Sequence, residues 1–227
     1  MTASHQLKSP VAIIQWCLQS VLENEEIDPK DVELVRKALI QANAMSHLIV
    51  DMLQVFRLQD TKDKGILFEP LNIGDLVDQI VGEYELVAHQ RGVHLERGPM
   101  AIVPTVAASP TYLRQAIINL IDNALKYTPS GKKVVVSLSY GKDNVLELEV
   151  KDQGIGIAEA EQSRLFTEFF RGSEAQEFSR EGTGLGLVLV RNIIEEFGGT
   201  VQVKSRLHHG STFTIRLPLN PNASLSQ

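Results

Sequence analysis

The sequence predicts an α+β protein. A helical hairpin, which forms a four-helix bundle in a dimer, precedes an α/β sandwich with a mixed, largely antiparallel sheet covered by helices. Two observations lead to this fold class. Residues 4–59 repeat apolar side chains at helical spacing with one interruption. From residue 66 to residue 217, helical stretches are interspersed with short runs of alternating apolar and polar residues, which are typical of strands.

The first predicted helix spans residues 4–23 and carries apolar side chains at positions 7, 11, 14, 18 and 21. Steps of four and three residues mark the seam of a helix that packs in a bundle. Residues 23–31 break the pattern, and Pro29 suits the start of a second helix from about Asp31 to Gln59. Two helices cannot bury both apolar stripes alone, so we expect a homodimer whose two hairpins form a four-helix bundle.

The rest of the chain supplies the sandwich. We predict a hairpin domain over residues 1–60, a polar hinge at 61–65, a catalytic domain at 66–219 and a disordered tail at 220–227. Helices are expected at 73–91 and 111–127, and a third follows residue 186. Strands are expected at 66–71, 94–96, 102–107, 134–140, 145–151, 200–205 and 212–217.

Composition excludes several classes of protein. A net charge of −6 argues against a nucleic-acid partner. The single cysteine, Cys17, excludes an internal disulfide framework and fits a reducing compartment such as the cytoplasm. The sequence has no apolar run of the length that a membrane-spanning helix needs, so we expect no membrane segment in this chain.

Four sequence blocks carry the functional signal, and two of them are rich in glycine. The glycine-rich blocks are DQGIGI at 152–157 and GTGLGL at 182–187; NLIDNALKYT lies upstream at 119–128 and LFTEFFRG lies between them at 165–172. Glycines at this density let the backbone approach a ligand closely. The second glycine block leads into a helical pattern, so its amides should favour an anion such as phosphate. Neither a Walker A loop nor a dinucleotide fingerprint is present.

The order and content of these blocks resemble the ATP-binding domain of sensor histidine kinases, within the superfamily of gyrase, heat-shock chaperone, histidine kinase and mismatch-repair ATPases. The segment SHQLKSP at 4–10 is similar to the phosphoacceptor-histidine box, so the resemblance covers essentially the whole chain. It implies ATP and Mg²⁺ as cofactors, autophosphorylation of His5, and relay to an aspartate of a response-regulator receiver domain. It also implies that the chain is the catalytic portion of a longer protein that could be membrane-anchored.

The resemblance assigns roles near the transferred phosphoryl group. His5 takes that group on a ring nitrogen. Gln6 stands where most relatives carry Asp or Glu; its amide can orient His5 but has no charge to offset the charge that develops. Asn123 supplies an oxygen to Mg²⁺. Asn119 occupies the position of the glutamate that activates water in hydrolytic members, which fits a kinase that preserves ATP for transfer. Arg171 approaches the γ-phosphate from a lid between residues 158 and 181.

The resemblance also assigns the nucleotide contacts. Asp152 accepts the exocyclic amine of adenine, Lys126 meets a phosphate and Tyr127 packs against the adenine. Backbone N–H groups of the second glycine block wrap the phosphates. The other predicted nucleotide-binding residues are Gly154, Gly156, Gly182, Thr183, Gly184, Leu185 and Gly186.

Simpler interpretations stay open for single residues, and two rival functions stay open for the chain. Asp152 could be only a turn former, and Arg171 could be only a partner in a surface salt bridge. The first rival function is a nucleotide-binding regulatory module with impaired kinase chemistry, which Gln6 supports. The second is a conformational ATPase of the same superfamily, against which Asn119 and the complete histidine box argue.

Overall fold

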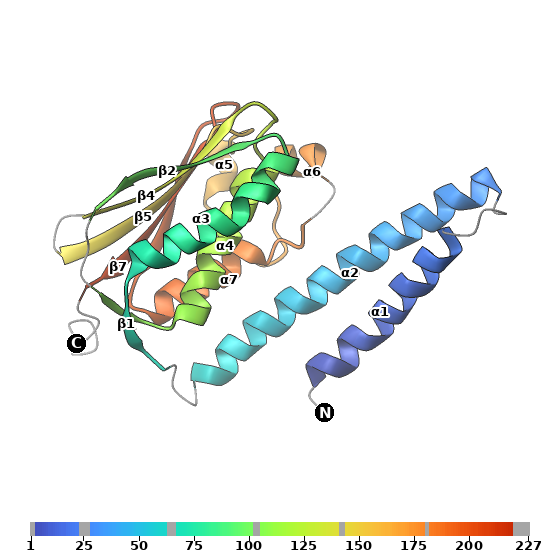
Figure 1. Cartoon of the computed structure of the whole chain (residues 1–227), viewed down its shortest axis with the longest axis horizontal. Coiled ribbons are helices and arrows are strands. Elements are labelled where there is room, and N and C mark those ends of the chain that lie inside the picture. The colour runs from blue at the N-terminus through green and yellow to red at the C-terminus, as the bar shows by residue number, and fades with distance from the viewer. Residues whose placement is uncertain are drawn as a thin grey trace.

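The computed structural model describes residues 3–22, 28–62, 67–101, 105–140, 144–179 and 182–219. The chain begins with a hairpin of two helices, α1 (Ala3–Leu22) and α2 (Pro29–Lys62), and α2 lies between α1 and the rest of the molecule (Figure 1). Both helices were predicted. Because α2 continues through Lys62, residues 61 and 62 are helical, which corrects the predicted start of the hinge. Neither residue is a helix breaker, and the first glycine of this region comes only at position 65.

A five-stranded sheet in the order β2-β4-β5-β7-β6 forms the centre of the sandwich. The strand β2 pairs with β4 in parallel, whereas every other neighbouring pair is antiparallel. The sheet is therefore mixed and largely antiparallel, as predicted. The strands span His94–Met100 (β2), Lys133–Tyr140 (β4), Val145–Asp152 (β5), Thr200–Ser205 (β6) and Ser211–Pro218 (β7).

Two further short strands, β1 (Glu69–Leu71) and β3 (Val106–Ala108), pair with each other and not with the main sheet. Of the strand predicted at 66–71, residue 66 lies outside the described residues, and residues 67 and 68 are not part of β1. Phe68 lies outside it and packs edge-on against Phe197, with ring centroids 5.6 Å apart. The strand predicted at 102–107 begins at Val106, and residues 102–104 lie outside the described residues. β2 runs past its predicted end and tolerates Pro99 because it is an edge strand.

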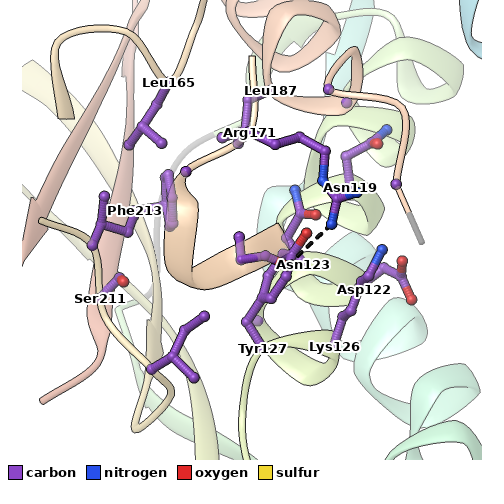
Figure 2. A pocket seen from close by; sticks show the side chains of 18 of the residues that line it. Asn119, Asp122, Asn123, Lys126, Tyr127, Leu165, Arg171, Leu187, Ser211 and Phe213 are labelled. Atoms are coloured by element: carbon purple, nitrogen blue, oxygen red, sulfur yellow. Dashed lines mark hydrogen bonds between the residues drawn. The ribbon is translucent and has the colours of Figure 1, made fainter. Parts of the chain in front are cut away.

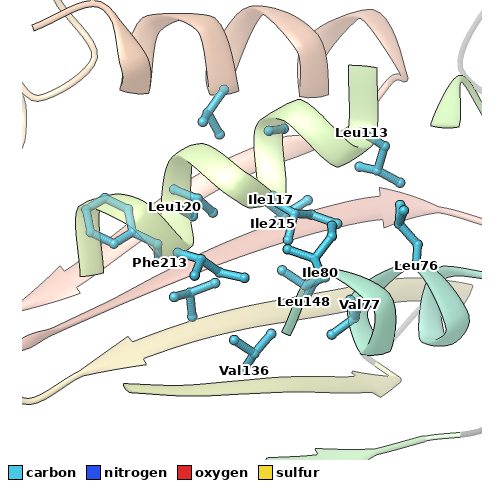
Figure 3. Packing of buried hydrophobic residues seen from close by; sticks show 14 of the residues in the cluster. Leu76, Val77, Ile80, Leu113, Ile117, Leu120, Val136, Leu148, Phe213 and Ile215 are labelled. Carbon is cyan, nitrogen blue, oxygen red and sulfur yellow. The ribbon is translucent and has the colours of Figure 1, made fainter. Parts of the chain in front are cut away.

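Three helices cover one face of the main sheet: α3 (Ile73–Gln90), α4 (Pro110–Lys126) and α7 (Gly186–Glu196) (Figure 1). Alternate residues of β4 and β5 point toward these helices. Figure 3 shows side chains of the sheet meeting those of α3 and α4 in one apolar core, among them Leu76, Val77, Ile80, Leu113, Ile117, Leu120, Val136, Leu148, Phe213 and Ile215. Burying one such large side chain contributes about 1.5–3 kcal/mol.

Local sequence fixes where these helices start. The Asn72 side chain accepts hydrogen bonds from the N–H groups of Gly74 and Asp75 at 3.0 and 3.4 Å, which caps α3. Pro110 occupies the first turn of α4, where its missing N–H costs nothing. Between β5 and α7 the predicted lid contains two short helices, α5 (Glu159–Gln162) and α6 (Ser173–Phe178). None of the described helices is both long and apolar enough to cross a membrane.

Candidate functional site

A cavity of about 420 Å³ lies between α4, the lid, the ends of β5 and β7, and one residue of α2. Figure 2 shows side chains of α4 along one side of it and Ser211 and Phe213 of β7 along another. Every predicted nucleotide-binding residue except Gly154 and Leu185 lines it. The cavity brings together Asn119, Asn123, Lys126, Tyr127, Asp152, Gly156, Gly182, Thr183, Gly184 and Gly186 with the predicted lid residue Arg171.

The polar side chains of α4 face the cavity because the helix is amphipathic. Its apolar residues, including Ile117 and Leu120, are fully buried against the sheet. Asn119 and Asn123 are four residues apart and therefore share one face of the helix. The Asn119 Nδ2 donates to the Gln115 carbonyl at 2.9 Å, which fixes the orientation of the amide. The sequence prediction that these two amides lie together is consistent with this geometry.

One end of the cavity, which we call the acidic end, is formed by Asp152 and its neighbours on β7. The side chain of Asp152 is only 7% exposed. Its Oδ1 accepts hydrogen bonds from the N–H groups of Gly154 and Ser211, at 2.8 and 3.0 Å. Burial raises the pKa of Asp152 from 3.8 to about 6, and the two backbone hydrogen bonds partly oppose that rise. At neutral pH the group is therefore an ionised acceptor. The sequence did not predict the hydrogen bond from Ser211, because only the pairing of β5 with β7 brings Ser211 next to Asp152.

The first glycine block packs against the protein's own backbone. A Cβ on Gly156, whose φ is +69°, would lie 2.1 Å from the Arg206 carbonyl oxygen, and one on Gly154 would lie 2.4 Å from the Tyr127 carbonyl oxygen. The Ile155 N–H donates to that same Tyr127 carbonyl at 3.1 Å. The turn is thus held between the end of α4 and the β6–β7 turn. Gly154 therefore has a packing role in this structure, and the nucleotide contact predicted for it stays a prediction.

The opposite end of the cavity, which we call the basic end, combines the second glycine block with Lys126 and Arg171. α7 begins at Gly186, and a Cβ there would lie 2.8 Å from the Asn119 Oδ1. The N-terminus of α7 thus opens toward α4 and carries the positive end of the helix dipole, as predicted. A Cβ on Gly182 would lie 3.0 Å from the Lys126 Nζ. An anion in this end would meet both the ammonium group and free helix amides.

Two residues of the second glycine block, Gly184 and Leu185, stabilise the conformation of the loop. Gly184 has φ of +75°, and a Cβ there would lie 2.6 Å from the Phe169 carbonyl carbon. Only glycine permits the loop to pass the lid this closely. Leu185 is buried, and its N–H donates to the Thr183 Oγ1 at 3.2 Å. The Leu185 N–H is therefore hydrogen-bonded within the loop in this structure, and the phosphate contact predicted for it stays a prediction.

The lid is tied together by polar contacts on both sides of α6. The Arg171 Nη2 donates to the carbonyls of Ala175 at 3.0 Å and Ser179 at 2.5 Å. The Glu161 Oε1 accepts from the N–H and the hydroxyl of Ser173, both at 3.0 Å. Arg171 thus braces the lid while its side chain borders the cavity (Figure 2). Glu161, which also lines the cavity, was missed, since one acid in a charged segment gives no sequence signal.

The oxygen donors at the basic end fit a magnesium ion that arrives with a nucleotide. Among the residues that the structure describes, no group of three or more His, Cys, Asp or Glu could hold a metal. Asn119 and Asn123 offer amide oxygens, and Mg²⁺ commonly takes few protein ligands because phosphates and water complete its shell. The two remaining predicted residues, His5 and Gln6, lie on α1, and their side chains fall outside the described part of the structure.

Comparison with known proteins connects this arrangement to characterised relatives. Residues 108–221 match the family described as histidine kinase-, DNA gyrase B-, and HSP90-like ATPase. The adaptive-response sensory kinase SasA of Rippkaea orientalis is 33% identical over 222 residues, which cover 95% of this chain and 56% of SasA. The sensor-like histidine kinase SenX3 of Mycobacterium tuberculosis is 30% identical over 215 residues, covering 95% of this chain and 52% of SenX3.

The chain thus spans about half the length of both of these relatives. Among solved structures, the Acinetobacter baumannii histidine kinase AdeS matches with a TM-score of 0.64 at 26% identity. That match covers 95% of this chain and 98% of the AdeS chain. The similarity therefore includes the helical hairpin as well as the sandwich.

Proposed function

The chain belongs to the histidine kinase-, DNA gyrase B- and HSP90-like ATPases, among the sensor histidine kinases of two-component systems, and we propose that it phosphorylates itself. The phosphoryl group passes from ATP to His5 and then to an aspartate on a response-regulator receiver domain. The chain acts as the catalytic portion of a longer sensor protein. A cytoplasmic location is part of the same proposal.

One observation carries the proposal: the basic end of the cavity meets the hairpin at the level of the histidine. Thr183 contacts Asp51 on α2. The Gln15 Nε2 on α1 donates a hydrogen bond to the Asn43 Oδ1 on α2 at 2.8 Å, so these two residues lie at the same level of the antiparallel hairpin. Asp51 comes eight residues after Asn43 on α2. Because α1 runs in the opposite direction, the matching level on α1 lies eight residues before Gln15, at position 7. His5 is two residues further, or about 3 Å along the helix axis.

The two ends of the cavity suit the two ends of ATP. At the acidic end both backbone donors bind the Asp152 Oδ1, which supports the Oδ2 as the acceptor of the adenine amine. At the basic end, Lys126 and the N-terminus of α7 are placed for phosphates. Tyr127 lies between them, with its ring 6.5 Å from that of Phe178 in the lid. Arg171 can turn from the lid carbonyls toward the γ-phosphate.

In the transfer step, a ring nitrogen of His5 bonds to the γ-phosphorus, the bond to the β–γ bridging oxygen breaks, and ADP leaves. The imidazole gives up its other proton to solvent, and Gln6 orients the ring. Mg²⁺ would neutralise charge on the phosphates when bound, with Asn123 as its protein ligand. Asn119 is an amide and cannot remove a proton from water, which favours transfer over hydrolysis.

The exposed apolar face of the hairpin supports a homodimer. Val11 is only 4% exposed, but Ile14 is 50%, Trp16 is 71%, Leu34 is 65% and Met45 is 56% exposed. A second copy of the hairpin would cover such side chains in a four-helix bundle. Sedimentation at micromolar concentration should give twice the 25.1 kDa chain mass, and a purely monomeric protein would contradict this part of the proposal.

Incubation with γ-labelled ATP tests the central proposal, with His5→Ala as the control. Acid-labile, base-stable label on the parent but not on His5→Ala is the expected result. Bound ATP without any label would instead identify a regulatory nucleotide-binding module. Release of free phosphate without labelled protein would identify a conformational ATPase. Addition of a purified receiver domain should then remove the label from His5 and place it on an aspartate.

A further inference from the structure

A carboxylate of the hairpin reaches the basic end of the cavity. Asp51 lies on α2, lines the cavity and is the only residue of the described hairpin that does so. The Thr183 hydroxyl donates to its Oδ2 at 2.5 Å, across a separation of 132 positions in the sequence. α2 also contacts α7, whose N-terminus follows Thr183 directly. The contact therefore joins the hairpin to the segment predicted to hold phosphates.

The surroundings of this contact suit a negative charge. Next to Thr183, a Cβ on Gly182 would lie 3.0 Å from the Lys126 Nζ and 3.6 Å from the Arg171 Nε. Two cationic groups, a hydroxyl donor and the positive end of α7 thus line the same end of the cavity as Asp51. A charged acceptor makes a stronger hydrogen bond than a neutral one in such a setting. These groups are also the ones that a nucleotide triphosphate needs.

We propose that the Asp51–Thr183 contact is autoinhibitory: the Asp51 carboxylate occupies the basic end in place of a nucleotide phosphate and holds α2 against the second glycine block. A phosphate and this carboxylate compete for the same donors and repel each other at short range. Phosphate binding therefore weakens the contact, and by linkage the contact weakens phosphate binding by the same factor. The inference rests on the proposed function only in assigning phosphates to the basic end.

The contact also separates the cavity from the phosphoacceptor. α2 lies between α1 and α7 in Figure 1, so α1, which carries His5, is on the far side of α2 from Thr183. While Asp51 holds Thr183, α2 therefore lies between the basic end and the helix that carries His5. Release of the contact lets the hairpin turn relative to the sandwich, which brings a phosphoacceptor helix to the cavity. One hydrogen bond thus links nucleotide occupancy to the arrangement of the hairpin.

Nucleotide affinity measured by calorimetry on the full chain tests this proposal. The variants are Asp51→Asn, which keeps an acceptor oxygen without charge, and Asp51→Ala, which removes the acceptor. Glu33→Gln is the matched control, because it removes one charge from α2 at an exposed pair with Lys37, 2.7 Å away. The probes are a non-hydrolysable ATP analogue and adenosine. Both Asp51 variants should bind the analogue about fivefold or more tightly, adenosine affinity should stay at the parent value, and Glu33→Gln should match the parent for both probes.

Three results would overturn the proposal. Unchanged analogue affinity in both Asp51 variants would show that the carboxylate does not compete with phosphates. Weaker analogue binding would show that Asp51 assists the nucleotide, for example through Mg²⁺. An equal change for adenosine and the analogue would show that the contact acts on the whole cavity. Because binding requires no phosphoryl transfer, a chain that binds as expected but never labels His5 would refute the proposed function and leave this inference standing.

Discussion

The buried carboxylate of Asp152 makes the sandwich less stable at neutral pH than an uncharged residue would. The pKa rises from 3.8 to about 6 on folding, a difference of about two pKa units, and each unit corresponds to about 1.4 kcal/mol. The folded chain therefore holds this proton more tightly than the unfolded chain. Stability falls as the pH rises from about 4 to about 6, and the full penalty of about 3 kcal/mol persists above that range.

Asp152→Asn removes this penalty and keeps the shape of the side chain. Its amide oxygen can still accept from the N–H groups of Gly154 and Ser211, which now bond the Oδ1 at 2.8 and 3.0 Å. We expect the free energy of unfolding of the variant, minus that of the parent, to rise by up to about 3 kcal/mol between about pH 4 and about pH 8. The variant should also bind ATP at least about tenfold more weakly, since it loses a charged acceptor.

The assay must report on the sandwich and not on the hairpin. The only tryptophan, Trp16, lies on α1, so its fluorescence reports on the wrong part of the chain. Amide hydrogen exchange of β5 and β7 in urea, compared between variant and parent at each pH, measures the right unfolding reaction. Glu85→Gln, which removes an exposed carboxylate from α3, is the control. A variant-minus-parent difference that is independent of pH would refute the reasoning about burial.

Three shorter predictions follow from other positions. Gly156→Ala should unfold at a clearly lower temperature than the parent, because its Cβ would meet a carbonyl oxygen at 2.1 Å. Gly131→Ala has open space around its Cβ and should lose only about 1 kcal/mol of unfolding free energy. Equal losses of stability in the two variants would contradict this reasoning. Leu148→Ala should cost about 2–5 kcal/mol in urea unfolding by leaving a core cavity, and a loss under 1 would argue against close packing. Gln6→Glu should raise the single-turnover labelling rate of the histidine by roughly tenfold or less, while an unchanged rate would show that charge at that position is not limiting.

Elements with strong periodicity could be predicted from the sequence, and elements defined by their partners could not. The apolar stripes of α1 and α2 and the alternation of β4 and β5 are local properties of the sequence. The predicted bounds of these four elements therefore agree with the structure to within a few residues. β1 and β3 are short because each has only the other as a partner, which no local pattern reveals. The parallel pairing of β2 with β4 likewise depends on where the chain returns after α4.

The candidate site divides in the same way. Asn119, Asn123 and Asp152 were predicted because they sit inside dense motifs. Ser211 and Asp51 were not, since each reaches the cavity through a contact between segments far apart in the sequence, 59 and 132 positions respectively. The glycines show a subtler limit: sequence indicates that a small residue is required, but only the structure shows whether a ligand or the protein's own backbone needs the space.

The turn that carries Asp152 has a consequence for the order of events when a ligand arrives. That turn is clamped from both sides, by the end of α4 and by the β6–β7 turn, where the His208 N–H donates to the Ile155 carbonyl at 2.6 Å. These contacts hold the turn in place without a ligand, so the acidic end is already formed before a nucleotide binds. The basic end is assembled from α2, the lid and the second glycine block, and we expect these three segments to move when phosphates bind. Encounter rates for nucleotides that share one base should thus be alike, and the length of the phosphate chain should decide how long each one stays.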